Sequence, residues 1–495
     1  MYKKDNGQLS IMEFISPFGK LDPKNRWVQI ANMIPWKKYE QKYAEKFCED
    51  NGAPAIKFRM AMGTLIIKQR TNHSDEEILQ DILENPYMQY LIGLHEFTTT
   101  APFASTSITN FRKYISKEMI NEINDEMFRN GNDKDDGNGD TGSDDNTKET
   151  ATMKKASENQ QQAKQADSDN EGTLMLDATC APADIAYPTD VNLLNEAREK
   201  LEGMIDALHP QGHNITKPRT YRKKARRNYL HFIKQKQPGH EKVRKAIGQQ
   251  LRYVKRNIQH IDNMLQKYSI DRLSSTQQKW LETIRLLYQQ QLSMYEQNTH
   301  SVDNRIVSIS QPHVRPIVRG KARAPVEFGA KVSISLVKGY TFIDRQDWEA
   351  YNEATDLIPA VEAYKKHYGH YPERVLADHI YRNRDNRAYC KKLGIRLSGP
   401  RLGKPPKEKD KDLLKQSRTD ACDRSAVEGK FGEGKTKYGL DRIMARLKDS
   451  SETVIALSFF CMNISRRLRI LLHFFSIRSF FRFHHFFIKF SWVFG

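Results

Sequence analysis

The spacing of apolar residues changes several times along the 495-residue chain. From Trp27 to about Phe128, apolar side chains recur at helical intervals with short breaks, which predicts an all-α N-terminal domain over residues 1–129. Within this stretch, Ser74 is followed three residues later by Glu77 and then by an apolar run. This is the pattern of a capping box that opens an amphipathic helix.

Apolar residues almost vanish over residues 130–172, where Asp, Asn, Gly, Gln and Ser dominate. Such a composition cannot bury enough surface to offset the entropy of ordering the chain, so we expect an acidic, disordered linker here. A calcium site is the alternative for its aspartates. Their spacing does not match an EF-hand loop with its closing glutamate, which favours the linker.

The apolar period becomes strand-like after Thr173, helical over residues 193–300, and strand-like again beyond them. We expect later strands at residues 305–309, 326–337, 340–343, 374–377 and 395–397, and helices at 355–367, 386–393 and from 410 onward. This order matches the ribonuclease H-like topology, in which the first and fourth strands lie side by side. We therefore predict an α/β fold with a ribonuclease H-like core over residues 173–192 and 301–465, interrupted by a helical insertion over residues 193–300.

The composition favours a polyanionic partner, because 80 Lys and Arg against 61 Asp and Glu give a formal charge of +19. Five scattered cysteines, with no Cys-x-x-Cys pair, indicate neither a disulfide framework nor a zinc site. The N-terminus lacks the apolar stretch of a signal peptide. These features together predict a cytoplasmic protein.

The last segment, residues 466–495, is dense in phenylalanine and resembles a membrane span at first sight. Arg478, Arg482 and Lys489 interrupt it, whereas a spanning helix needs about 20 mostly uncharged residues. We therefore expect an aromatic and basic tail that packs or meets a partner protein, and no contact with a membrane.

The helical insertion carries a run of cations between Lys217 and Lys236 with no acid among them and with aromatic residues interleaved. Cations neutralise phosphates and aromatic rings can stack on bases, so we expect DNA contact, with a solvated helix face as the plainer alternative. The predicted phosphate-binding residues of this run are Arg222, Lys223, Lys224, Arg226 and Arg227.

Three carboxylates far apart in the chain carry the candidate chemistry. Asp177 and Asp378 each follow a short apolar run, and Glu428 lies in a helical segment four residues after Arg424. Phosphodiester cleavage builds negative charge at an anionic phosphorus, and two metal ions about 4 Å apart can stabilise both reacting oxygens. We expect two Mg²⁺ ions, with Mn²⁺ as a substitute, held by these three acids as metal ligands and catalytic residues.

Within this set, Asp177 is the candidate for bridging both ions, and Glu433 is the rival of Glu428 as third acid. Arg424 and Lys435 would lie on the same helix face as Glu428 and hold a phosphate beside it. Three glycines between residues 429 and 434 weaken a helix there, so Lys435 could instead stand on a turn after it.

These residues resemble the signature of the DDE transposases of bacterial insertion sequences, in the group four and five superfamily. The family's third acid stands in an Arg-x3-Glu-x6-Lys pattern, which Arg424, Glu428 and Lys435 match. The stretch Asp177-Ala-Thr, with Tyr187-Pro-Thr-Asp190, resembles the block around the family's first acid, and Ala377-Asp378 with Tyr381 resembles the second. Ala421 departs from the family, which often has a tyrosine three residues before the arginine.

The resemblance implies a transposase that binds terminal inverted repeats, cuts at the element boundary and joins the freed ends to target DNA. It also implies a homodimer on paired ends, and a helical N-terminal domain that binds DNA ends, dimerises or only packs. A metal-dependent nuclease of the same fold without strand transfer is one alternative. A DNA-binding or regulatory protein without enzymatic activity is another, although the retained acids and Lys435 argue against it.

Overall fold

The computed structural model describes residues 13–48, 54–129, 170–210, 216–318, 326–399 and 411–491. Of α15 beyond residue 471, only the backbone is described. The predicted acidic linker therefore lies almost entirely outside the described residues.

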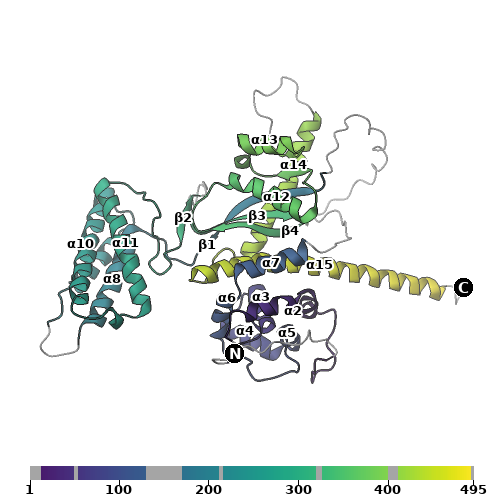
Figure 1. Cartoon of the computed structure of the whole chain (residues 1–495), viewed down its shortest axis with the longest axis horizontal. Coiled ribbons are helices and arrows are strands. Elements are labelled where there is room, and N and C mark those ends of the chain that lie inside the picture. Colours follow the sequence, from purple (N-terminus) through teal and green to yellow (C-terminus); the bar gives the residue numbers. More distant parts are fainter. Residues whose placement is uncertain are drawn as a thin grey trace.

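The N-terminal part of the chain is helical, as its apolar spacing predicts (Figure 1). The capping box is confirmed, because Glu77 N–H donates to Ser74 Oγ at 3.2 Å and Ser74 N–H donates to Glu77 Oε2 at 2.9 Å. The helices are α1 (Arg26–Met33), α2 (Trp36–Ala44), α3 (Phe58–Thr71), α4 (Asp75–Glu84), α5 (Pro86–Leu91), α6 (Ser107–Tyr114) and α7 (Lys117–Phe128).

A mixed sheet follows, with strand order β2-β3-β1-β5-β6 and with β4 also paired to β3. β3 runs antiparallel to β1, β2 and β4, whereas β5 runs parallel to β1 and β6 runs parallel to β5. The chain is therefore a mixed α and β protein. The strands are β1 (Thr173–Pro182), β2 (Arg315–Val318), β3 (Val326–Val337), β4 (Tyr340–Asp347), β5 (Arg374–Leu376) and β6 (Arg396–Leu397).

Helices cover this sheet. The short helices η2 (Glu353–Asp356) and η3 (His379–Tyr381) flank α12 (Leu357–Tyr368), and α13 (Arg384–Lys392) precedes β6. α12 and α14 (Lys411–Lys437) both pack on β1, and α14 also contacts β5. The long helix α15 (Lys448–Ser491) packs on β4 and on α7, so the N-terminal helices and the sheet meet along it (Figure 1).

The prediction of a strand at residues 305–309 is wrong. These residues form no strand, and the strand nearest to them is β2. Ile306 and Ile309 are buried in the core of the insertion, and Ile306 N–H donates to the side chain of Gln290 at 3.0 Å. The apolar alternation there reflects an extended segment that packs without pairing to a neighbouring strand.

The insertion forms a separate lobe beside the sheet (Figure 1). Its helices are α8 (Asp190–Leu208), α9 (Arg222–Ile233), α10 (His240–Leu265), η1 (Ile270–Arg272) and α11 (Ser275–Gln297). Its buried residues form their own hydrophobic cluster, whereas a second cluster joins the N-terminal helices to the sheet and α15. Among the described residues, no helix is both long and apolar enough to cross a membrane.

Candidate functional site

The first predicted acid lies within strand β1, and the second lies two residues beyond the end of the neighbouring strand β5. β1 and β5 run parallel, and Met175 pairs with Leu376 two residues before each acid. If the strand alternation continues for two residues past β5, Asp378 falls level with Asp177, and the charge of Asp378 does act on the Asp177 carboxyl. The topology thus brings together two carboxylates that are about 200 residues apart in sequence.

Asp177 is a largely buried carboxylate whose side chain is 17% exposed. Burial raises its pKa to about 6, against the lowering effects of the Ala178 N–H, which donates to Oδ1 at 2.8 Å, and of Arg424. The negative charges of Glu353 and Asp378 raise it further. Asp177 therefore sits where negative charge is crowded and a cation would be favoured.

Asp378 caps the short helix η3 and is half-exposed. Burial acts to raise its pKa, but the N–H of His379, at 2.6 Å from Oδ1, and the His379 ring, at 3.0 Å, outweigh it. The charge of Arg424 acts in the same direction, and the pKa of Asp378 lies below its ordinary value. The two neighbouring acids thus have opposite pKa shifts, with Asp378 the more readily ionised.

Arg424 connects the third acid to the first. Its Nη1 lies 3.9 Å from Asp177 Oδ2, and its Nη2 lies 3.0 Å from Glu428 Oε1, one helical turn further along α14. One guanidinium therefore stands between the two carboxylates. The Glu428 side chain is 59% exposed, which leaves it accessible to a large substrate.

The three acids share one region without forming a closed cage. Among the described residues, no three His, Cys, Asp or Glu side chains lie close enough together to hold a metal ion. The donor set nevertheless has the chemistry of a site for hard divalent cations, because it offers only carboxylate oxygens. Burial first, and the charges of Glu353 and Asp378 after it, raise the pKa of Asp177. Arg424 supplies the positive charge between Asp177 and Glu428 here.

α14 extends through Lys437, so Lys435 is helical and does not stand on a turn. Lys435 lies two turns beyond Glu428 and is half-buried. The rival acid Glu433 pairs with Lys430 at 3.1 Å and with Arg469 of α15 at 3.5 Å. Glu433 is thus directed toward α15, whereas Glu428 is directed toward Asp177 through Arg424.

Sequence reasoning missed Glu353. This acid opens η2, pairs with Lys331 Nζ at 2.9 Å, and raises the pKa of Asp177 more than Asp378 does. No apolar run precedes it, so it lacks the strand-end signal that marks Asp177 and Asp378. The one local signal is the position just after Asn352, which caps η2.

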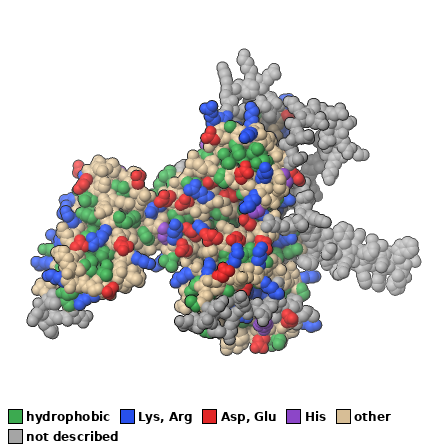
Figure 2. All heavy atoms as spheres, viewed as in Figure 1, with side chains coloured by type: hydrophobic (Ala, Val, Ile, Leu, Met, Phe, Trp, Pro, Cys, Tyr) green, Lys and Arg blue, Asp and Glu red, His purple; other side chains and the backbone are tan. Residues whose placement is uncertain are grey.

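The predicted basic residues lie on α9, whose only buried residue is Ala225. Lys223, Lys224, Arg226 and Arg227 are exposed, and Figure 2 shows cations along the outer edge of the insertion lobe. Arg222 differs from the others, because its two terminal nitrogens pair with Asp206 at 2.9 and 2.7 Å. Its charge is therefore already matched within the lobe.

Comparisons with known proteins match two segments of the chain. Residues 375–465, which contain Asp378 and Glu428, match the family model of a Transposase DDE domain, and residues 16–114 match a Transposase domain (DUF772). Asp177 lies outside both segments. The chain is also similar to an uncharacterized protein, ORF8 in the nfe locus, from Rhizobium meliloti, with 25% identity over 207 residues that cover 42% of this chain and 83% of the relative.

No solved structure matches the chain. The two transposase segments flank the sheet region that supplies Asp177, and the second of them holds the Arg424, Glu428 and Lys435 signature. Together, these matches support the resemblance of the chain to the DDE transposases of bacterial insertion sequences.

Proposed function

We propose that this protein cleaves DNA at the ends of its insertion element and joins the freed 3′-hydroxyl groups to target DNA, with Asp177, Asp378 and Glu428 as its catalytic acids. One observation carries the proposal. Parallel strands β1 and β5 bring Asp177 level with Asp378, and Arg424 links Asp177 to Glu428 on α14.

The strand order supports a ribonuclease H-like core for this chemistry. Because β4 also pairs with β3, one path across the sheet runs β4-β3-β1-β5-β6. In it, β1 and β5 are neighbours, as the first and fourth strands are in that fold, and β3 is antiparallel and β5 parallel to β1. In such a core the acids come from two adjacent strands and one packing helix. β1, β5 and α14 would supply them in this chain.

The proposed acids would hold two Mg²⁺ ions, which supply an activated water and stabilise charge on the reacting oxygens. Asp378, with its lowered pKa, stays ionised at neutral pH. Asp177, with a pKa of about 6, binds a proton more readily and so gains most from a neighbouring cation. Arg424 and Lys435 would bind the phosphate beside Glu428.

DNA is the proposed macromolecular partner, as terminal inverted repeats and as target. The exposed cations of α9 can neutralise backbone phosphates without reading sequence. Two ends must be held together for transposition, so a homodimer on paired ends is part of the proposal.

The test uses the full chain, Mg²⁺, and a linear DNA that carries both flanks of its own reading frame. We expect the wild type to cut at the element boundary, and Asp177→Ala, Asp378→Ala and Glu428→Ala each to reduce cutting at least ~100-fold while DNA binding persists. Glu433→Ala is the control, because Glu433 pairs with Lys430 and Arg469 instead.

Pre-cut ends separate the possible outcomes. Joining of pre-cut ends to a plasmid supports a transposase, and cutting without joining would assign a nuclease. If Asp177→Ala cuts as fast as the wild type, the acids have no catalytic role and the proposal fails.

A further inference from the structure

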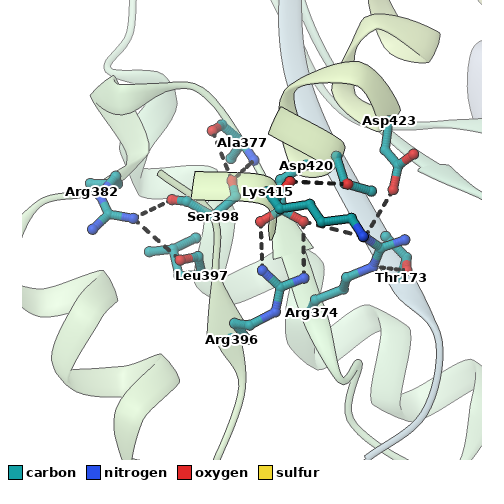
Figure 3. A network of polar contacts seen from close by, with 11 residues as sticks. Thr173, Arg374, Ala377, Arg382, Arg396, Leu397, Ser398, Lys415, Asp420 and Asp423 are labelled. Atoms are coloured by element: carbon teal, nitrogen blue, oxygen red, sulfur yellow. Dashed lines mark hydrogen bonds and ion pairs between the residues drawn. The ribbon is translucent and has the colours of Figure 1, made fainter. Parts of the chain in front are cut away.

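The helix that carries Arg424 and Glu428 is anchored by a buried acid near its middle. Every described side chain of α14 before residue 420 is exposed, and Asp420 is the first buried one, at 5% exposure. Arg396 of β6 binds it with both terminal nitrogens, Nη1 to Oδ2 at 2.5 Å and Nη2 to Oδ1 at 2.9 Å (Figure 3). Such a two-pronged contact fixes direction as well as distance.

Arg374 of β5 completes the anchor. Its Nη1 lies 3.3 Å from Asp420 Oδ1 and 2.8 Å from Asp423 Oδ2, and its Nε donates to Thr173 Oγ1 at 2.7 Å (Figure 3). We name Asp420, Arg374 and Arg396 the Asp420 clamp. The clamp ties α14 to β5 and β6 and, through Thr173, to β1.

The strand residues of the clamp form one row across the sheet. Thr173 pairs with Arg374, and Arg374 pairs with Arg396. Asp177 lies four residues further along β1, and Asp378 lies four residues after Arg374, just past the end of β5, so both are about 13 Å from the row at about 3.3 Å per extended residue.

The spacing along α14 matches this distance. Glu428 follows Asp420 by eight residues, a rise of about 12 Å at 1.5 Å per residue, and Arg424 lies halfway between them. Arg424 reaches Asp177 at 3.9 Å, so helix and strands run in the same direction from the clamp to the acids. A helix held at Asp420 therefore presents Glu428 level with Asp177 and Asp378.

We propose that Asp420 is a positioning residue, which sets the register of α14 along the sheet and acts on the reaction only through Arg424 and Glu428. The inference rests on the proposed function of those residues. Val427 and Phe431 also pack this stretch of helix into the core, and the two-pronged ion pair adds a contact of fixed direction. A slip of one helical turn is about 5.4 Å, and misplacement by about 1 Å can cost about 100-fold in rate.

A purely structural ion pair makes a different prediction. Loss of such a pair lowers the stability of the fold, but the molecules that remain folded react at the normal rate. Loss of a positioning contact slows the reaction in folded molecules and leaves their affinity for DNA unchanged.

The experiment compares two substitutions in the full chain, with Mg²⁺ and the linear DNA that carries both flanks of the reading frame. Asp420→Asn keeps the shape and removes the charge, whereas Arg396→Lys keeps the charge and removes the two-pronged contact. We expect cutting at saturating DNA to fall at least ~10-fold in each, with the Kd for DNA within about twofold of wild type. Asp420→Glu, which retains the carboxylate, is expected to recover part of the rate.

Glu126→Gln is the matched control. Glu126 also accepts from two side chains of another helix, Lys38 at 2.8 Å and Tyr39 at 2.6 Å, but it ties α7 to α2 away from the acids. We expect it to lower the thermal midpoint without slowing the reaction. Hydrogen exchange around Arg424 and Glu428 should rise in Asp420→Asn and stay unchanged in the control.

Several results would overturn the inference. Unchanged cutting in Asp420→Asn would do so, as would equal losses of rate and DNA affinity, which would make Asp420 part of the DNA contact. If Asp420→Asn does not fold, Arg396→Lys decides by the same criteria, and failure of both to fold would assign the clamp to folding alone. Asp177→Ala is measured in parallel. If Asp177→Ala is inactive and Asp420→Asn is fully active, the role of the clamp is disproved and the proposed function stands. If Asp177→Ala is active, the proposed function itself is disproved.

Discussion

At the scale of single residues, the raised pKa of Asp177 makes stability depend on pH in metal-free buffer. The folded protein ionises this carboxyl near pH 6, whereas the unfolded chain does so near its ordinary value of 3.8. Below about pH 4 both states are protonated and the group has no effect. As pH rises toward 6 and above, ionisation favours the unfolded chain by up to about 3 kcal/mol, at about 1.36 kcal/mol per pH unit.

Asp177→Asn removes this penalty. We expect the variant to be more stable than wild type at about pH 8 in EDTA, with the difference vanishing near pH 4. The free energy of unfolding, measured in urea across this range, checks the sign. Mg²⁺ should then stabilise the wild type and leave the variant unchanged, because a ligand stabilises only a state that binds it. A wild type that is the more stable protein at pH 8 without metal would contradict the account.

The residues of the site were foreseeable to different degrees. Asp177 and Asp378 each follow a short apolar run, so the local sequence is enough to predict that a strand precedes each of them. The surroundings of Glu353 and Asp420 could not, because they depend on Lys331 and Arg396, each more than 20 residues away in sequence. Local pattern carries no information about such partners, and both residues look like ordinary surface acids in the sequence.

At the scale of elements, α14 runs through three glycines that were expected to weaken it. Gly434 has a packing reason, because an added Cβ there would lie 2.6 Å from Leu440 Cδ1 and 3.2 Å from Met462 Sδ. Gly429 and Gly432 face open space. A helix can tolerate glycine at about 1 kcal/mol each when tertiary contacts hold it, which is why propensity alone misjudged this segment.

These glycines give a matched comparison. Gly434→Ala should lower the free energy of unfolding by about 1 to 3 kcal/mol, because its Cβ crowds the junction of α14 and α15. Gly429→Ala should instead raise it by up to about 1 kcal/mol, because nothing obstructs the new methyl group. Urea unfolding of both variants checks the opposite signs. Equal effects at the two positions would mean that the surroundings of Gly434 do not constrain the helix.

The α9 helix exposes several positively charged side chains to solvent. Replacing Lys223, Lys224, Arg226 and Arg227 with Gln should weaken DNA binding and flatten its dependence on salt, by about 0.9 in the logarithmic slope for each DNA phosphate that is no longer neutralised. Arg222→Gln should have a smaller effect, since Asp206 already matches its charge. Fluorescence anisotropy at several salt concentrations measures both. An unchanged slope in the fourfold variant would place the DNA-binding surface elsewhere.

At the scale of the whole molecule, the described chain has two hydrophobic cores, one shared by the N-terminal helices, the sheet and α15 and the other within the insertion. The N-terminal helices share one core with the sheet, and the buried Asn463 of α15 joins them by bonding to Asn124 at 2.8 Å and to Thr341 at 2.7 Å. The sequence predicts the N-terminal helices as a separate domain because a polar linker follows them. A change in composition along the chain does not show which apolar faces pack together in the fold.

The insertion, by contrast, has its own core and a narrow attachment. Its entry and exit lie together, because Arg305 Nη2 donates to Asp190 Oδ1 at 2.6 Å. Removing residues 191–304 and joining Asp190 to Arg305 with a short Gly-Ser linker should therefore leave the remainder folded. Ile306 and Ile309 need polar replacements in this variant, since both pack against the insertion in the intact chain.

We expect the shortened protein to keep a cooperative thermal transition and to lose most of its affinity for DNA if α9 is the main DNA-binding element. Removal of residues 1–129 should have the opposite effect on folding, because it strips apolar side chains from the core that the sheet shares. Circular dichroism and calorimetry of the two deletions distinguish them. If the protein without the insertion fails to fold and the protein without residues 1–129 folds, the assignment of the N-terminal helices to the core of the sheet is wrong.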